Sequence, residues 1–379
     1  MKKWTQKEDG YLRDNYSTKS VREIATALGV GYNAVYSRAM KLGLKKPEFD
    51  PKQAKEKREE ATFKKKYVDA CEKIERLEEE KRIILGFEDV EPIKIEPRPL
   101  HSGAESTAVA LLSDWHFEET VTPQSVNGLN KFNTKIAEER IVYLFQTIVK
   151  FIKLHQNETT INNLVLALLG DFISGGIHDD LKEVNELQTI PAIMEVEKLI
   201  YSGILHILDN TEVNIVVPCS VGNHSRITEK QRVATEHGNS LELWMYAHLA
   251  KLFEGNQRVK FVINEGYHNL VNVFGYTLRF HHGHDIKYGG GIGGIFIPVY
   301  KAISQWNKGQ HADLDCFGHF HQMKDGGNFI SNGSLIGYNA FAVKIKADFE
   351  KPKQAFFLID KKRFVICTRS ILLNGNIKE

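Results

Sequence analysis

The sequence predicts a large α/β domain that follows a small all-α module and a long helix. Over residues 107 to 379, short apolar runs alternate with helical stretches, which is typical of a sheet covered by helices. Residues 1 to 46 carry the capping signals of short helices. Residues 52 to 85 are rich in Glu, Lys and Arg and have few helix breakers, which favours one continuous helix.

The first 46 residues predict a helix-turn-helix module. Thr5 to Glu8 and Ser20 to Glu23 both match the capping-box pattern that opens a helix. A third helix is expected from about Tyr32 to Leu42, after a short turn that contains glycine. Two helices joined by such a turn, with a polar and basic free face on the second, have the geometry that enters a DNA major groove. The residues that we expect to contact DNA are Asn33, Tyr36, Arg38 and Lys41.

This segment resembles the homeodomain-like or Myb-like modules found at the ends of many phage and mobile-element proteins. The resemblance covers about 45 residues and rests on Trp4, Ile24-Ala25, Leu28-Gly29 and Leu42-Gly-Leu44. It implies that DNA is a partner. A helical bundle used for protein contact is the alternative.

The helix predicted over residues 52 to 85 has an apolar repeat with alternating spacings of four and three. The repeat consists of Phe63, Tyr67, Ala70, Ile74, Leu77 and Ile84, with Lys81 in its one polar position. Such a repeat indicates a short coiled coil and hence a homodimer, although a solvated spacer helix would have the same composition. Pro92, Pro97 and Pro99 then mark residues 86 to 106 as an extended linker.

Charge and composition exclude several classes of protein. The net charge is only +2, but residues 1 to 50 hold ten Lys or Arg against six Asp or Glu, whereas residues 101 to 379 hold 27 against 29. The four cysteines form no C-x-x-C pair, so neither a zinc ribbon nor a disulfide framework is expected. No signal peptide or apolar stretch of about 18 residues occurs. We therefore expect a cytoplasmic protein that has no membrane anchor.

Five apolar runs end in residues that can bind metals. Such runs are typical of buried strands, and loops beyond the carboxyl ends of strands are where α/β proteins build sites. The residues at these ends are Asp114 and His116, Asp171, Asn223 and His224, His282 and His284, and His319 and His321.

Two Asp, one Asn and four His from these loops can hold two adjacent metal ions, with Asp171 counted for both. Carboxylate, amide and imidazole ligands suit divalent ions, and we expect manganese before iron, zinc or magnesium. Two such ions, about 3.5 to 4 Å apart, clamp the attacking and leaving oxygens of a displacement at phosphorus. The pattern therefore predicts phosphoester hydrolysis by a metal-bridging hydroxide. No nucleophile elbow, P-loop or paired-cysteine site competes with this interpretation.

The ordered series D-x-H, G-D, G-N-H, H-G-H and G-H-x-H resembles the calcineurin-like metallophosphoesterase superfamily over about residues 107 to 360. The resemblance implies a sandwich of two mixed β-sheets flanked by helices. It also implies that Asp114, His116, Asp171 and His321 hold one metal, and that Asp171, Asn223, His282 and His319 hold the other. Asp171 and His224 would be the catalytic residues, with His224 assisting the leaving group.

The series departs from the family pattern after His224. Many relatives have a carboxylate there, whereas this chain has Ser225 and then Arg226, so the partner of His224 is open. We expect Arg226 and His284 to contact the substrate.

Joined to a DNA-binding module, the site suggests a phage-type DNA nuclease near the double-strand-break repair branch. The alternatives are a phosphatase or phosphodiesterase on nucleotides or small phosphoesters, and a DNA-binding regulator with an inactive metal-binding domain.

Overall fold

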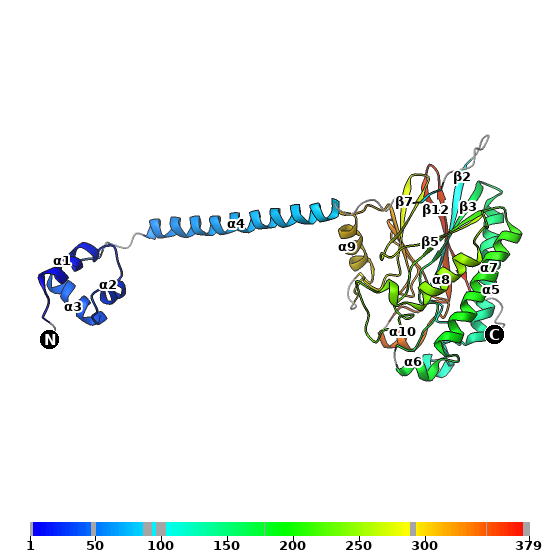
Figure 1. Ribbon diagram of the computed structural model, residues 1–379, viewed down its shortest axis with the longest axis horizontal. Coiled ribbons are helices and arrows are strands. Elements are labelled where there is room, and N and C mark those ends of the chain that lie inside the picture. The colour runs from blue at the N-terminus through cyan, green and yellow to red at the C-terminus, as the bar shows by residue number, and fades with distance from the viewer. Residues whose placement is uncertain are drawn as a thin grey trace. The chain divides into compact units, whose positions relative to one another are not determined.

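The computed structural model describes residues 3–46, 51–85, 93–95, 104–177, 179–288, 293–345 and 347–373. Its contacts divide the chain into two compact units, Met1–Gly86 and Phe87–Glu379. Both units are drawn in Figure 1.

The first unit begins with three short helices, α1 (Gln6–Asn15), α2 (Val21–Ala27) and α3 (Tyr32–Lys41). Both predicted capping boxes form, because the side chains of Thr5 and Ser20 accept the backbone N–H groups of Glu8 and Glu23. The three helices share a small core made of Leu12, Tyr16, Ile24, Ala25, Val35 and Ala39. The predicted helices are confirmed, and their use in DNA binding stays a prediction.

The long helix α4 spans Pro51–Leu85, as its composition predicts. Four members of its apolar repeat are half exposed or more in the single chain: Phe63 by 72%, Tyr67 by 64%, Ile74 by 56% and Leu77 by 50%. A coiled-coil partner would cover such a stripe. The homodimer therefore stays a prediction.

The second unit contains two six-stranded mixed sheets, which confirms the predicted architecture. The first sheet has the strand order β1-β6-β7-β8-β10-β9, and the second has the order β12-β11-β2-β3-β4-β5. Strands β2, β3, β4 and β5 are parallel neighbours, and so are β7 and β8. The strands are β1 (Ile93–Ile95), β2 (Glu105–Leu112), β3 (Thr160–Leu168), β4 (Asn214–Cys219), β5 (Val259–Ile263), β6 (Asn269–Val273), β7 (Tyr276–Phe280), β8 (Leu314–Phe317), β9 (Lys324–Asp325), β10 (Phe329–Ser331), β11 (Lys353–Asp360) and β12 (Phe364–Leu372).

The helices of this unit cover the outer faces of the sheets, as Figure 1 shows for α5 and α7 on one side and α9 on the other. They are α5 (Thr134–His155), α6 (Asp179–Val184), α7 (Thr189–Asn210), α8 (Leu241–Leu252), α9 (Phe296–Trp306) and α10 (Ala340–Ile345). Short 3-10 turns occur at Pro123–Val126 and His237–Asn239.

Strand β2 shows how the layers form. Successive side chains of a strand point to opposite faces, and all eight residues of β2 are buried. Ala108, Ala110 and Leu112 pack toward α5, α7 and α8, while Val109 and Leu111 pack between the two sheets. The resulting order of layers is helices, sheet, sheet and helix.

The predicted linker needs one correction. Residues 93–95 form strand β1, which pairs in parallel with β6, so this part of residues 86 to 106 belongs to a sheet. Residues 105 and 106 already belong to β2. Residues 86–92 and 96–103 lie outside the described part of the chain.

None of the helices in the described ranges is both long and apolar enough to cross a membrane. All four cysteines are free thiols.

Candidate metal centre

The loops that follow five strands bring the predicted ligands together. Strands β2, β3 and β4 lie side by side in one sheet, and β7 and β8 lie side by side in the other. Because parallel strands end at the same edge of a sheet, the loops beyond them are neighbours. Three groups result, each with ligand atoms within 4.8 Å of one another: Asp114, His116 and His321; His116, Asp171 and His224; and Asp171, His282 and His319.

The first group joins the β2 loop to the β8 loop. The Nε2 atoms of His116 and His321 are 3.2 Å apart, and His321 Nε2 lies 3.4 Å from Asp114 Oδ1. Burial, together with His224 and His321, lowers the pKa of His116 well below its usual value. Burial would also lower the pKa of His321, but Asp114 reverses the effect and raises it. Imidazole groups beside a carboxylate are a donor set that divalent ions bind.

The second and third groups share Asp171. Its Oδ2 atom lies 2.9 Å from His282 Nε2, and its Oδ1 atom accepts the backbone N–H of His224 at 2.8 Å. Burial would raise the pKa of Asp171, but His282 and His224 lower it well below its usual range. Burial would lower the pKa of His282, but Asp171 raises it to about 10. Asp171 therefore stays ionised and, because it belongs to two of the three groups, it can serve two cations.

Asn223 follows strand β4 in the same set of loops. Its side-chain oxygen is buried and has no hydrogen-bond partner among the described residues. An unsatisfied buried polar atom costs about 1–3 kcal/mol. A neutral oxygen left in this state fits a ligand to a cation, and both neighbours of Asn223 in the chain, Gly222 and His224, approach Asp171 closely.

Five of the seven expected ligands have left-handed backbone conformations. The φ angles are 54° at Asp114, 47° at His116, 52° at Asp171, 69° at His319 and 54° at His321. Such angles are uncommon outside glycine, and where they cluster they often mark functional sites. The fold thus holds these five residues in strained backbone conformations, and all five belong to the three groups of candidate ligands.

Two glycines allow the loops to approach closely. A Cβ atom on Gly222 would lie 2.2 Å from the backbone N and Oδ1 of Asp171, and one on Gly318 would lie 2.4 Å from Asp114 Oδ2. Real Cβ contacts are essentially never this short. A side chain at either position would displace a ligand.

In three histidines of the site, the ring nitrogen Nδ1 is held by a hydrogen bond to another part of the protein. His282 Nδ1 donates to the carbonyl of Leu169 at 2.6 Å, and His224 Nδ1 donates to the carbonyl of Ser174 at 3.0 Å. Ser174 Oγ lies 2.9 Å from His116 Nδ1 and donates to Glu119 at 2.9 Å, so it accepts from the histidine. Each bond leaves Nε2 to face the centre, which is how the surroundings of metal-binding histidines usually act.

Ser174 therefore supplies the partner of His224 that the sequence left open. The serine that follows His224 has another role, because Ser225 Oγ lies 2.7 Å from Ser240 Oγ. The oxygen that holds His224 is a backbone carbonyl, which no side-chain pattern could reveal.

Two buried carboxylates that the sequence reasoning missed hold the loops in place. Glu242 accepts the backbone N–H groups of Phe172 and Gly222, and so ties the β3 loop to the β4 loop. Glu118 accepts those of Ser174 and Gly175. Burial raises the pKa of each carboxyl group to about 7. For Glu118, the available signal was its place two residues after His116; Glu242 had no signal, because its partners are distant in the sequence.

Neither a protein-family model nor a curated protein matches this chain. Among solved structures, it is similar to a conserved uncharacterised protein, described as a predicted phosphoesterase, from Streptococcus pneumoniae (9% identity, 72% of this chain, 92% of that chain, TM-score 0.31). It is similar to a dimetal phosphatase from Danio rerio (9%, 70%, 99%, TM-score 0.34) and to Vacuolar Protein Sorting 29 from Cryptosporidium parvum (11%, 71%, 99%, TM-score 0.27). At these sequence identities and TM-scores the similarity carries no argument about function. The function is therefore argued from the site itself.

The two residues expected to contact substrate have other partners. Three nitrogens of Arg226 donate to the backbone carbonyls of Thr228, Asn223 and Glu229, so the guanidinium holds its own loop. The side chain of His284 is only 2% exposed, and its Nε2 lies 2.9 Å from Glu236 Oε1. Both residues thus have partners within the protein, and their contact with the substrate stays a prediction.

Arg38 in the first unit also has partners within the protein. It forms an ion pair and two hydrogen bonds with Asp9, and its guanidinium lies 5.9 Å from the centre of the Trp4 ring. It therefore fastens α3 to α1, and its contact with DNA stays a prediction. Asn33, Tyr36 and Lys41 are exposed on α3, as predicted.

Proposed function

We propose that this protein is a phosphoester hydrolase that uses two divalent metal ions, and that its natural substrate is a phosphodiester bond in DNA. The observation that carries the first part is the sharing of Asp171 between ligand groups drawn from both sheets. A carboxylate with one oxygen beside His282 and the other beside His224 can bridge two cations.

The residues present fit such a pair. Asp114, His116, Asp171 and His321 would hold one ion, and Asp171, Asn223, His282 and His319 the other. The orphaned oxygen of Asn223 and the Nε2 atoms that face inward support this assignment. Two ions bound there would activate water and neutralise charge on the phosphate oxygens.

His224 is suited to act on the leaving group. Its Nδ1 is held by the carbonyl of Ser174, and its ring lies 4.8 Å from that of His116. When Nε2 is protonated, it can donate that proton to the leaving oxygen as the P–O bond breaks. The fixed ring needs no reorientation for this transfer.

The assignment of DNA rests on the first unit. Residues 1 to 50 carry the basic excess of the chain. On α3, the stacked rings of Tyr32 and Tyr36 are 49% and 45% exposed, with Lys41 exposed further along the helix. Lysine can neutralise phosphates, and aromatic rings can pack on bases.

The test compares full-length variants in the presence of manganese on end-labelled DNA and on bis(p-nitrophenyl) phosphate. Asp171→Asn should abolish both activities, because it weakens the ligand shared by both ions. A Tyr36→Ala/Lys41→Ala double variant should lose most DNA cleavage at physiological salt and keep hydrolysis of the small substrate. Lys251→Ala, which removes an exposed lysine from α8, is the matched control.

The outcomes separate the two parts of the proposal. If the protein hydrolyses bis(p-nitrophenyl) phosphate but leaves DNA uncleaved, the nuclease assignment is refuted and a small-phosphoester hydrolase is favoured. No hydrolysis with manganese, iron, zinc or magnesium would refute the enzyme and favour a DNA-binding regulator.

A further inference from the structure

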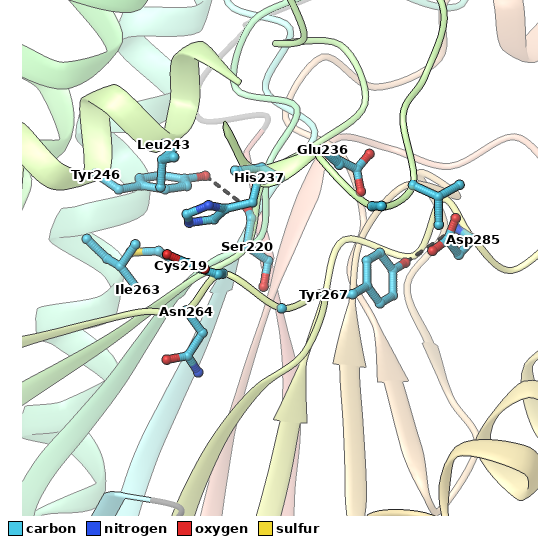
Figure 2. Close-up of a pocket in the computed structure, with 15 residues that line it drawn as sticks. Cys219, Ser220, Glu236, His237, Leu243, Tyr246, Ile263, Asn264, Tyr267 and Asp285 are labelled. Atoms are coloured by element: carbon cyan, nitrogen blue, oxygen red, sulfur yellow. Dashed lines mark hydrogen bonds between the residues drawn. The ribbon is translucent and has the colours of Figure 1, made fainter. Parts of the chain in front are cut away.

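A pocket lies at the carboxyl ends of strands β4 and β5 (Figure 2). Its empty volume, including the part open to solvent, is about 620 Å³. Leu243, Tyr246 and Ile263 form an apolar side. In Figure 2 the ring of His237 lies near Tyr246, while Tyr267 and Asp285 lie opposite.

The pocket shares its walls with the loops of the metal centre. Val221, in its wall, directly precedes the Gly222-Asn223-His224 segment. Glu236, also in its wall, contacts His284, whose ring lies 5.4 Å from the ring of His282. A phosphoester bound at the centre can therefore extend one of its ester groups toward this pocket.

The lining carries negative charge only. It includes the carboxylates of Glu236, Glu265 and Asp285, and it includes no lysine or arginine. The carboxylates of Glu265 and Asp285 have no hydrogen bond or ion pair within the described ranges, whereas Glu236 contacts His284. The Nε2 atom of His237 is buried and also lacks a partner there. The lining therefore offers hydrogen-bond acceptors and repels a second anionic group.

We propose that this pocket binds a nitrogen group that donates hydrogen bonds and belongs to one ester arm of the substrate. Two sources share this chemistry, the exocyclic amine of a nucleobase and an alkylammonium group. The inference rests on the proposed phosphoester hydrolysis and narrows its substrate to phosphodiesters with an amino-bearing arm. Glu265 and Asp285 would accept from the amine, and the apolar side would cover the carbon atoms next to it.

Isothermal titration calorimetry on the full-length protein tests binding without any reaction. The probes are cytidine, uridine and ethanolamine; cytidine has an amine where uridine has a carbonyl oxygen. Cytidine should bind about tenfold more tightly than uridine, which is the usual effect of one hydrogen bond to a charged group. None of the probes contains phosphate, so the measurement does not depend on hydrolysis.

A Glu265→Gln/Asp285→Asn double variant keeps the shape of the pocket and removes two charges. It should lower the affinity for cytidine about tenfold. Glu254→Gln removes an exposed carboxylate outside the pocket and should change nothing. Circular dichroism of each variant checks the fold.

Each result decides the matter. Tight cytidine binding that the double variant weakens supports a nucleobase, and ethanolamine binding that it weakens supports an alkylammonium group. Equal binding of cytidine and uridine with no ethanolamine binding, or no binding of any probe at millimolar concentration, overturns the proposal. Absent hydrolysis by the wild-type protein would overturn the proposed function instead, and the calorimetry would still report on the pocket.

Discussion

Replacing Ser174 by alanine should weaken metal binding, although Ser174 is not itself an expected metal ligand. Ser174 is fully buried, and its hydroxyl group accepts from His116 Nδ1 and donates to Glu119, each at 2.9 Å. Alanine would leave the N–H of His116 buried without an acceptor, at a cost of about 1–3 kcal/mol. The backbone carbonyl that holds His224 would remain. The change therefore removes the partner of His116, an expected metal ligand, and leaves the hydrogen bond that holds His224 in place.

The expected effect is a drop of about 10–100-fold in metal affinity, the usual result of removing such a partner of a ligating histidine. This corresponds to about 1.4–2.8 kcal/mol. Calorimetric titration with manganese measures it directly, and hydrolysis of bis(p-nitrophenyl) phosphate at saturating manganese should fall much less.

Ser225→Ala is the matched control. Ser225 is also buried and next to His224, but its hydroxyl group pairs with Ser240 and contacts no expected ligand. It should leave manganese affinity within about twofold of wild type. Wild-type affinity in Ser174→Ala, or an equal loss in Ser225→Ala, would refute the reasoning.

Three further predictions follow from contacts in the two units. Gly222→Ala should abolish metal binding, because the new Cβ would lie 2.2 Å from Asp171 Oδ1; Gly238→Ala, with nothing within 4 Å, should be neutral in the same titration. Arg38→Ala should lower the melting temperature of the first unit, because it removes the ion pair with Asp9. Lys41→Ala should weaken DNA binding and leave the melting temperature unchanged. If Arg38→Ala instead weakened DNA binding without changing the melting temperature, Arg38 would be a DNA contact. Removing metal with a chelator should lower the melting temperature of the second unit, and manganese at 100 times its Kd should restore about 2.7 kcal/mol; identical melting curves would contradict metal binding to the folded state.

Much of the fold could be predicted because its signals are local. The alternation of apolar runs with helical stretches over residues 107 to 379 indicated a sheet covered by helices, and the structure has helices α5, α7, α8 and α9 between its strands. The candidate ligands could be found for a related reason. Each follows a short apolar run, and parallel strands bring the ends of such runs to one edge of a sheet.

The partners of these residues could not be predicted because they are distant in the sequence. His224 and Ser174 are 50 residues apart, and Glu242 and Phe172 are 70 apart. The partner of Arg38 was missed for the same reason. Helical periodicity predicted that the Arg38 side chain faces solvent, but it is paired with Asp9 of α1, 29 residues away in the sequence.

The strained backbone at five ligands links the fold to the chemistry. Each left-handed residue costs on the order of 1–3 kcal/mol, so it persists only where other contacts determine it. Those contacts come from neighbouring loops: the N–H of Leu335 donates to the carbonyl of Asp114, and the N–H groups of Trp115 and His116 donate to that of Asp171. All of them are contacts within the protein. They fix the backbone that carries the expected ligands, and a ligand that is already oriented costs less to order when a cation binds.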